Sequence, residues 1–232
     1  RFEPVNADLP ASESGWRTPF CLRSVDSPDE RFCDYATPGA SFDLGACNDG
    51  TVWVPDAGGK AYARFHFNQS ERLSALLEQI PNLSIAERLT VGSNTKALLD
   101  AGLATPDDLV ASAEGLMAAG DRWSQSMAFG WSTDWLEDIL SPDAQDVLTA
   151  WAAKRVGQIE PRYTTTTFRP DESEAEALHH RAVLRFLANV AQDKKTVEAL
   201  KAHGKAWLTG GQSPDGAIPE SYVSTALQVF AE

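Results

Sequence analysis

Apolar and polar residues alternate with two different periods in this chain, and the change falls near Asn68. Before it, short apolar runs occupy Pro19–Ser24, Arg31–Tyr35, Phe42–Ala46, Thr51–Val54 and Ala61–Phe67. In the last run, apolar side chains stand at every second position, which is typical of a strand with one apolar face. Turn-forming residues such as Asn48-Asp49-Gly50 separate the runs. We therefore expect about five strands in a small antiparallel β-sandwich.

From Asn68 onward the apolar positions recur at helical spacing. The expected helices are Gln69–Ile80, Ile85–Leu103, Pro106–Ala119, Asp121–Leu140, Pro142–Val156, Glu172–Ala191, Lys194–Leu208 and Pro219–Ala231. Three starts carry capping signals: Asn68 with Glu71, Ser84 with Glu87, and Thr105 before a proline.

Short connections between these helices predict antiparallel neighbours. Successive helix pairs of about 35–40 residues are typical of a HEAT-like array, an α-solenoid in which each pair packs on the next. The sequence thus predicts a mainly α protein with two domains. A small β-sandwich would occupy residues 1–67, and a helical array residues 68–232.

The formal net charge of -13 argues against a nucleic-acid partner, because binding to phosphates needs basic patches. No apolar run reaches the roughly 20 residues of a membrane span. The sequence begins at Arg1 without a methionine or signal peptide, so we expect it to be part of a longer protein.

The three cysteines all fall in the strand-rich part, and none shows the short spacing of a zinc or redox motif. A hairpin turning near Val25–Pro28 would place Cys21 opposite Cys33, and one turning near Gly39 would place Cys33 opposite Cys47. One disulfide, with the Cys21–Cys33 pairing slightly favoured, would suit an exported protein. Three buried thiols in a cytoplasmic protein are the alternative.

Several short motifs occur one after another in the order of a known family. The matching positions are Tyr62, Arg64, Phe65, Ile85, Arg88, Ala101 and Gly102. They give a Tyr-x-Arg-Phe strand after a Gly-rich turn, then Ser-Ile-x-x-Arg and Ala-Gly-Leu. This order resembles the C-terminal half of the zinc aminopeptidases of the alanyl aminopeptidase (gluzincin) family. The chain departs from that pattern at Ala61 and Ala63, and at Asn94, where the family tends to carry Asp.

The resemblance extends over residues 10 to 232 and implies a β-sandwich followed by antiparallel helices. It also implies a parent protein that removes N-terminal residues from peptides with a zinc ion held upstream of this chain. The partners would be that upstream catalytic domain and the peptide substrates. The relatives resembling the strand region favour a periplasmic or secreted location, with the cytoplasm as the alternative.

No residue of this sequence forms the family's zinc motif, His-Glu-x-x-His, whose spacing sets two imidazoles on one helical face. The four histidines, His66, His179, His180 and His203, are each followed by another residue type than Glu. Adjacent helical residues point about 100° apart, so His179 and His180 are not expected to share a metal ion. We therefore assign no catalytic, metal or cofactor-binding residue to this chain, and expect it to be inactive and free of zinc.

Three further groups of residues have structural interpretations. Trp123, Met127, Trp131 and Trp135 recur along one helical face and are expected in the core, while Gly130 marks a point where that helix could break. First-turn carboxylates, Asp107-Asp108 and Glu172-Glu174-Glu176, suit the helix dipole. Arg64 is expected to pair with Glu71 or Glu87 at the strand–helix junction.

Two functions of different classes are consistent with these observations. The first is the non-catalytic C-terminal portion of a zinc aminopeptidase, which encloses the peptide-binding cavity of the catalytic domain. The second is a freestanding helical-repeat module that binds a protein partner. A weaker third possibility is a hydrolase that uses Asp and His residues without a recognisable motif.

Overall fold

The fold was determined as a computed structural model. It describes residues 18–36, 50–61, 63–138, 141–167, 169, 171–210 and 220–231. By their internal contacts the residues form two units, Arg1–Ala119 and Gly120–Glu232, and each is considered by itself. The sandwich of residues 1–67 and the helical array of residues 68–232 stay a prediction. Within the described ranges, no helix is both long and apolar enough to cross a membrane.

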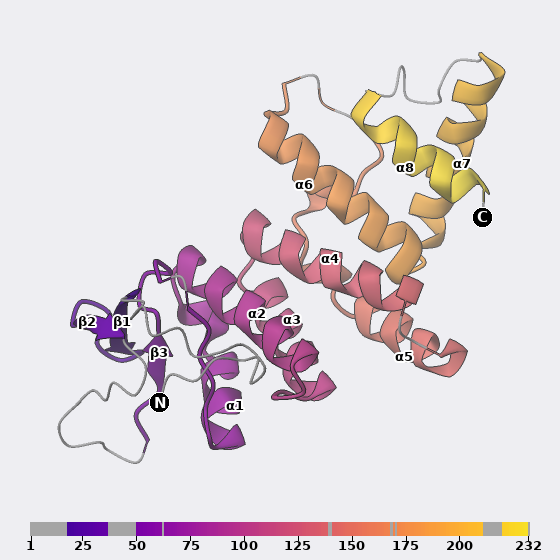
Figure 1. The fold of residues 1–232 in the computed structure, drawn as a ribbon. Helices are drawn as coiled ribbons and strands as arrows, with labels where there is room; N and C mark the ends of the chain where they lie inside the picture. The colour runs from indigo at the N-terminus through magenta and orange to yellow at the C-terminus, as the bar shows by residue number, and fades with distance from the viewer. Residues whose placement is uncertain are drawn as a thin grey trace. The chain divides into compact units, whose positions relative to one another are not determined.

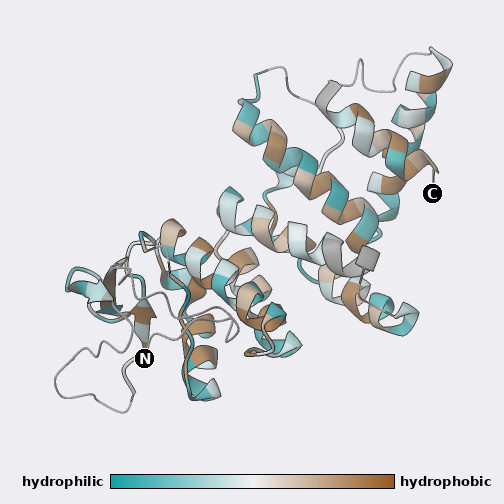
Figure 2. Ribbon diagram, in the orientation of Figure 1, coloured by the Kyte–Doolittle hydropathy of each residue, from teal (hydrophilic) through white to brown (hydrophobic). Residues whose placement is uncertain are grey.

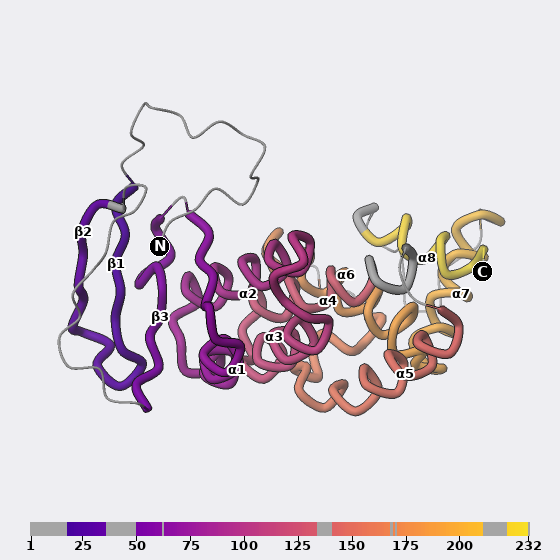
Figure 3. The backbone as a smooth tube through the Cα atoms, turned by 60° about the horizontal axis from the view of Figure 1, so that its bottom comes forward, coloured from indigo at the N-terminus to yellow at the C-terminus, as the bar shows by residue number. Residues whose placement is uncertain are grey.

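The N-terminal unit contains a three-stranded antiparallel sheet of order β2-β1-β3 (Figures 1 and 3). Its strands are β1 (Thr18–Ser24), β2 (Phe32–Ala36) and β3 (Trp53–Pro55). The first two lie where the apolar runs predicted them, and β3 covers the end of the fourth run. The expected strand Phe42–Ala46 lies outside the described residues.

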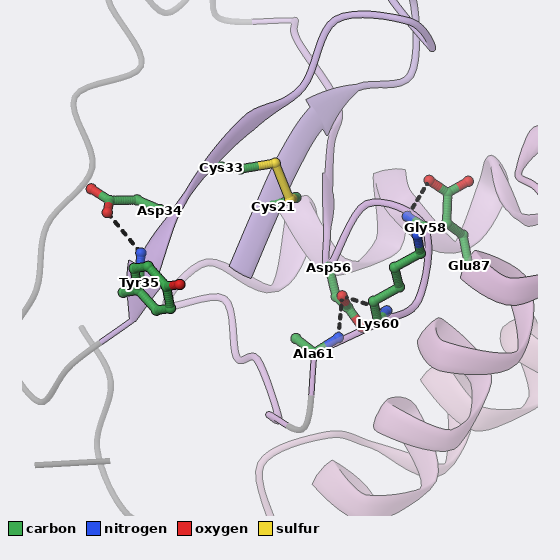
Figure 4. The surroundings of a disulfide bond; sticks show 9 residues. All are labelled: Cys21, Cys33, Asp34, Tyr35, Asp56, Gly58, Lys60, Ala61 and Glu87. Atoms are coloured by element: carbon green, nitrogen blue, oxygen red, sulfur yellow. Dashed lines mark hydrogen bonds between the residues drawn. A yellow bond between two sulfur atoms is a disulfide. The ribbon is translucent and has the colours of Figure 1, made fainter. Parts of the chain in front are cut away.

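The β1–β2 hairpin turns near Val25–Pro28, at the first of the two turn positions that the sequence suggested. Its register sets Cys21 opposite Cys33, and a disulfide joins them (Figure 4). The favoured pairing is confirmed, and a Cys33–Cys47 bond is excluded because Cys33 is already bonded. A cross-link in adjacent strands fixes their register, which a three-stranded sheet specifies only weakly by packing.

The segment Ala61–Phe67 is not a strand among its described residues, which corrects the fifth expected strand. It is held instead by one side chain of a helix. The Asn94 amide accepts a hydrogen bond from Phe65 N at 3.0 Å and donates one to Phe65 O at 2.9 Å. These are the two bonds that a neighbouring strand would supply. A strand-like pattern therefore persists without a sheet, because Asn94 satisfies the backbone of Phe65.

The helical segments described in this unit are α1 (Ser70–Glu78), the short η1 (Ile80–Asn82), α2 (Ile85–Asp100) and α3 (Pro106–Ala118). They lie close to the predicted spans, with η1 at the end of the first. The capping boxes at Ser84 and Thr105 are confirmed. The cap at Asn68 is wrong: Gln69 precedes the first helix and makes no side-chain cap bond. Packing of Leu73, Leu76 and Leu77 holds that helix in place of a cap.

An ion pair that the sequence did not indicate joins the sheet to α2. The Arg23 guanidinium donates from Nε to Glu87 Oε1 and from Nη2 to Glu87 Oε2, both at 2.8 Å. Both side chains are buried. Arg64, the expected partner of Glu87 or Glu71, is exposed and donates to Ser93 Oγ at 3.0 Å. The prediction named the right carboxylate and the wrong arginine.

Glu87 also closes the turn before Ala61. Its Oε1 accepts from Gly58 N at 3.0 Å (Figure 4). Its Oε2 accepts from the Ser84 backbone nitrogen and hydroxyl. Burial alone would raise the pKa of Glu87, but the bonds from Arg23, Ser84 and Gly58 outweigh it and lower that pKa to about 2. One carboxylate thus serves as helix cap, ion-pair partner and turn acceptor.

The turn itself requires glycine. A Cβ on Gly59 would lie 2.8 Å from the carbonyl oxygen of Ala86, and the backbone φ there is +63°. Asp56 Oδ1 accepts from the backbone nitrogens of Lys60 and Ala61 at 2.9 and 2.7 Å, as Figure 4 shows. The Gly-rich turn predicted before the segment is therefore confirmed, and it lies directly against α2.

The described part of the C-terminal unit is helical. It comprises α4 (Arg122–Asp138), α5 (Pro142–Ala153), η2 (Val156–Gln158), η3 (Pro161–Tyr163), α6 (Glu174–Arg185), the π-helical η4 (Phe186–Val190), α7 (Lys194–Thr209) and α8 (Glu220–Ala231). Figure 2 shows apolar and polar residues interleaved along these helices, as is typical of amphipathic helices. α4 is continuous through Gly130, so the predicted break is wrong.

The core of this unit gathers Leu184, Ala188, Leu200, Tyr222, Ala226 and Val229 from α6, η4, α7 and α8. The last two helices approach closely at Gly204, where a Cβ would lie 2.6 Å from the carbonyl oxygen of Ala226. Because η4 continues α6 with wider turns, its backbone bond runs from Ala191 N to Phe186 O at 2.9 Å.

Candidate functional site

The four histidines occupy three different environments. His66 is exposed beside the Asn94-bound segment, while His203 is buried in α7. His179 and His180 are both buried on α6 and bond to different partners. Both imidazole rings lie edge-on to the Tyr163 ring, with centroid distances of 4.7 Å for His179 and 5.8 Å for His180. Within the described ranges, no three His, Cys, Asp or Glu side chains are grouped to hold a metal ion.

His180 is the centre of a buried polar network. Its Nδ1 lies 3.0 Å from Glu172 Oε1, and its Nε2 lies 2.7 Å from the carbonyl oxygen of Thr165. The imidazole thus lies between a carboxylate oxygen and a backbone carbonyl oxygen. Glu172 Oε2 accepts from the Tyr222 hydroxyl at 3.1 Å. The network ties the linker before α6 to α8.

Glu172 was predicted to be a first-turn carboxylate of the sixth helix, and that assignment is wrong. The helix begins at Glu174 after the N-cap Ser173, so Glu172 lies before it. Its side chain is buried, and its Oε1 also lies 3.3 Å from Arg169 Nε. Glu174 and Glu176 do lie in the first turn, and Glu176 completes a capping box with Ser173.

Burial sets the ionisation of the network's neighbours. It raises the pKa of the Tyr222 phenol, and the negative Glu172 raises it further. Burial also lowers the pKa of His179 to about 4, with His180 adding to the effect. At neutral pH, His179 is therefore an uncharged imidazole that donates a hydrogen bond from one nitrogen and accepts one at the other.

His179 pairs with a serine. Ser126 Oγ on α4 lies 2.9 Å from His179 Nδ1, and the Tyr163 ring meets the imidazole edge-on at 4.7 Å. A serine next to a neutral imidazole is the first half of a nucleophilic site. Among the described residues, however, no carboxylate is hydrogen-bonded to His179 to orient it. The contacts fit a packing role between α4 and α6.

Only some of the described side chains in the tryptophan stripe on α4 are buried, and the side chain of Trp135 lies outside the described residues. Trp131 is buried, but Trp123 is exposed and stacks with the Arg122 guanidinium at 5.1 Å. The buried face of α4 also carries Phe129 and the polar side chains of Ser132 and Thr133. Their hydroxyls donate back to the carbonyls of Ala128 and Phe129, so they need no partner from another helix.

A pocket of about 620 Å³ lies in the C-terminal unit, between α4, α5, η4, α7 and α8. Its wall residues are Thr133, Gln145, Ala188, Asn189, Gln192, Lys194, Val197, Glu198, Lys201 and Val229. Neither Ser126 nor His179 lines the pocket. The pocket volume is in the range of pockets that hold small molecules. Sequence reasoning missed the pocket, because its residues come from five elements and match no motif.

A scan against protein-family models and a search of curated proteins find no match to this chain.

Proposed function

We propose that this chain is the non-catalytic C-terminal portion of a zinc aminopeptidase, and that it encloses the peptide-binding cavity of an upstream catalytic domain. The observation that carries the proposal is the junction at Phe65. Two residues of the family resemblance lie at that junction. Phe65 is bracketed by the amide of Asn94, a position where the family tends to carry Asp, and Arg88 donates to the carbonyl oxygens of Ile80 and Pro81 at 3.1 and 2.7 Å. The resemblance implies such a joint between extended chain and helices.

The proposed helical part is a HEAT-like array. Helices two apart in the chain pack on each other, α1 on α3 in one unit, and α4 on α6 and α6 on α8 in the other. These contacts support the proposal, because helices of stacked pairs also pack on the pair before or after them. In a peptidase, such walls would limit access to short or flexible peptides and exclude water from the reacting bond.

In this proposal the parent's zinc lies upstream, and the protein is exported to the periplasm or secreted. The Cys21–Cys33 disulfide supports an oxidising compartment, because structural disulfides persist there. The partners are the catalytic domain of the same polypeptide and the peptides on which it acts.

The test compares the 232-residue chain with a protein that also contains the residues encoded immediately upstream. Zinc is measured by elemental analysis, and activity by release of product from aminoacyl reporter substrates. We expect the longer protein to contain about one zinc ion and to lose its activity with a chelator. The chain alone should contain well under one zinc ion and release no product. Stoichiometric zinc with chelator-sensitive activity in the chain alone refutes the proposal.

A freestanding interaction module is the second candidate. Trp207 and Leu208 at the end of α7 favour it, since both expose more than half of their surface and large exposed apolar side chains can anchor a partner. The upstream sequence separates the two: a His-Glu-x-x-His motif followed by a further Glu ligand supports the peptidase. A signal peptide directly before Arg1 supports the module.

A further inference from the structure

The pocket in the C-terminal unit has an apolar base and a charged mouth. Ala188 and Val229 are buried at its wall, and Gln192, Lys194 and Glu198 are exposed. Such a division suits a ligand with an apolar stem and polar ends. The pocket shares no wall residue with the histidine network, and a ligand bound in it is independent of the proposed function.

The backbone beside the pocket is unusual in two ways. The π-helical η4 interrupts the regular turns at Phe186–Val190, and π-bulges are frequent at functional positions. Two residues later, Gln192 has a φ of 49°, a conformation that costs a non-glycine residue energy. Both deviations lie near Asn189, whose Oδ1 is buried and has no hydrogen-bond partner among the residues that the structure describes. A ligand N–H group would remove the cost of that unpaired acceptor.

The charges on α7 run against the helix dipole. Lys194 and Lys195 occupy its first turn, where cations are unfavourable, and no acidic residue lies there. The Asp193 carboxylate is turned onto Thr196, whose nitrogen and hydroxyl lie 2.9 and 2.7 Å from Oδ1. Within the described part of the chain, no ion pair joins Lys194 or Lys201 to a carboxylate. We infer that the two lysines at the start of α7 have a role other than stabilising that helix.

The spacing along α7 sets the shape of the complementary ligand. Lys194, Glu198 and Lys201 all line the pocket. Seven residues of α-helix span about 10.5 Å, so the two ammonium groups are rooted two turns apart with a carboxylate between them. An elongated molecule with a carboxylate at each end and a donor near its middle is complementary to that order.

We propose that this pocket binds a small dicarboxylate of about dipeptide length that carries an amide N–H between its ends. Lys194 and Lys201 each hold one carboxylate, and Asn189 Oδ1 and Glu198 accept from the central N–H. The stem lies on Ala188, Val197 and Val229. No bond forms or breaks in this step.

The probe is glutarylglycine, which has two terminal carboxylates and one amide N–H. Suberate has the same backbone length without the N–H, and pentanoylglycine keeps the N–H but has only one carboxylate. Isothermal titration of the 232-residue chain should show glutarylglycine binding about tenfold more tightly than either analogue. Equal affinity for all three, or no binding of glutarylglycine, refutes the proposal.

Variants test the named side chains. Lys194→Gln and Lys201→Gln should each weaken glutarylglycine binding about tenfold, the effect of one charge-assisted bond. Lys195→Gln is the matched control, since it removes the same charge from the same turn without touching the pocket, and should change affinity less than about twofold. Equal losses from all three would show a diffuse charge effect and refute the site. Asn189→Leu should reduce the preference for glutarylglycine over suberate, because Glu198 is then the one acceptor left for the N–H.

One further probe distinguishes an acidic peptide segment from a free dicarboxylate as the ligand. An acetylated, amidated peptide that carries two Glu residues separated by one Ala presents two carboxylates joined by amides. Tighter binding of this peptide than of glutarylglycine makes an acidic peptide segment the ligand. Weaker binding makes it a free dicarboxylate, and either result supports the proposal. Inorganic phosphate that displaces glutarylglycine at equal concentration shows a general anion site and overturns it.

Discussion

Removing Arg23 should destabilise the N-terminal unit by about 3 kcal/mol. The guanidinium and the Glu87 carboxylate are both buried and make two bonds of 2.8 Å. Breaking a buried pair on one side costs about 3–5 kcal/mol, because a charge is left behind without its partner. Three donors, from Gly58 and Ser84, would still reach Glu87. They place the expected cost of Arg23→Met at the lower end of that range.

A second substitution shows whether the stranded charge is the cause. Glu87→Gln keeps a side-chain acceptor for Ser84 but removes the negative charge. If the cost of Arg23→Met is that of an unpaired charge, the double variant should be more stable than Arg23→Met alone. Arg64→Met is the matched control: Arg64 is exposed and makes one bond to Ser93, so its loss should cost less than about 1 kcal/mol.

The assay is urea denaturation followed by circular dichroism and fitted with one transition for each unit. Arg23→Met should move only the transition of residues 1–119, which makes the other unit an internal control. Equal effects of Arg23→Met and Arg64→Met would refute the reasoning. So would a double variant that is less stable than Arg23→Met, because the cost would then come from lost packing.

The same pair has a pH signature. The folded chain holds the pKa of Glu87 at about 2, below its usual 4.5. The unfolded chain therefore binds the proton first, and the stabilisation is complete above about pH 4.5 and disappears as the pH falls toward 2. In Arg23→Met, a carboxylate without its cation should have a higher folded pKa, so this loss should become smaller.

Three other predictions concern single interactions. Asn94→Leu should destabilise by about 2–3 kcal/mol in urea denaturation, because Phe65 N and O both lose their partner; an unchanged midpoint would contradict this. Mass spectrometry without reductant should find Cys21 bonded to Cys33, and reduction should cost roughly 3 kcal/mol; three free thiols would contradict it. Because the pKa of His179 falls to about 4 on folding, stability of the C-terminal unit should rise between about pH 4 and 6.5, and His179→Asn should remove that rise.

Local signals account for the parts of the fold that the sequence predicts well. The β1–β2 hairpin depends on a turn next to Pro28, and a turn at that place brings Cys21 opposite Cys33. Helix starts at Ser84 and Thr105 depend on residues three positions apart. Each of these features involves residues whose spacing along the chain already determines their geometry.

Features that depend on distant residues were not predictable in the same way. Alternation places Arg23 in a strand, but nothing near it in sequence indicates a partner 64 positions away. The pattern of Ala61–Phe67 is equally consistent with a strand and with an extended segment bonded to Asn94. The Tyr222 hydroxyl donates to Glu172, which lies 50 positions earlier in the sequence. Because this contact is not visible in the local sequence, Glu172 was assigned to a helix start although it is buried.

Net charge and local charge answer different questions, and the pocket shows the difference. The total of -13 argues against nucleic acid, because that partner needs a basic surface over many phosphates. A small dianion needs only two cations at the right spacing. Lys194 and Lys201 provide them on one helix, with the dipole of its first turn adding to the positive field. An acidic protein repels anions in general, so an anion that reaches only one lysine gains little on balance. A ligand whose two carboxylates reach both lysines gains two ion pairs. The net negative charge of the protein should therefore increase the preference for dicarboxylates over monocarboxylates.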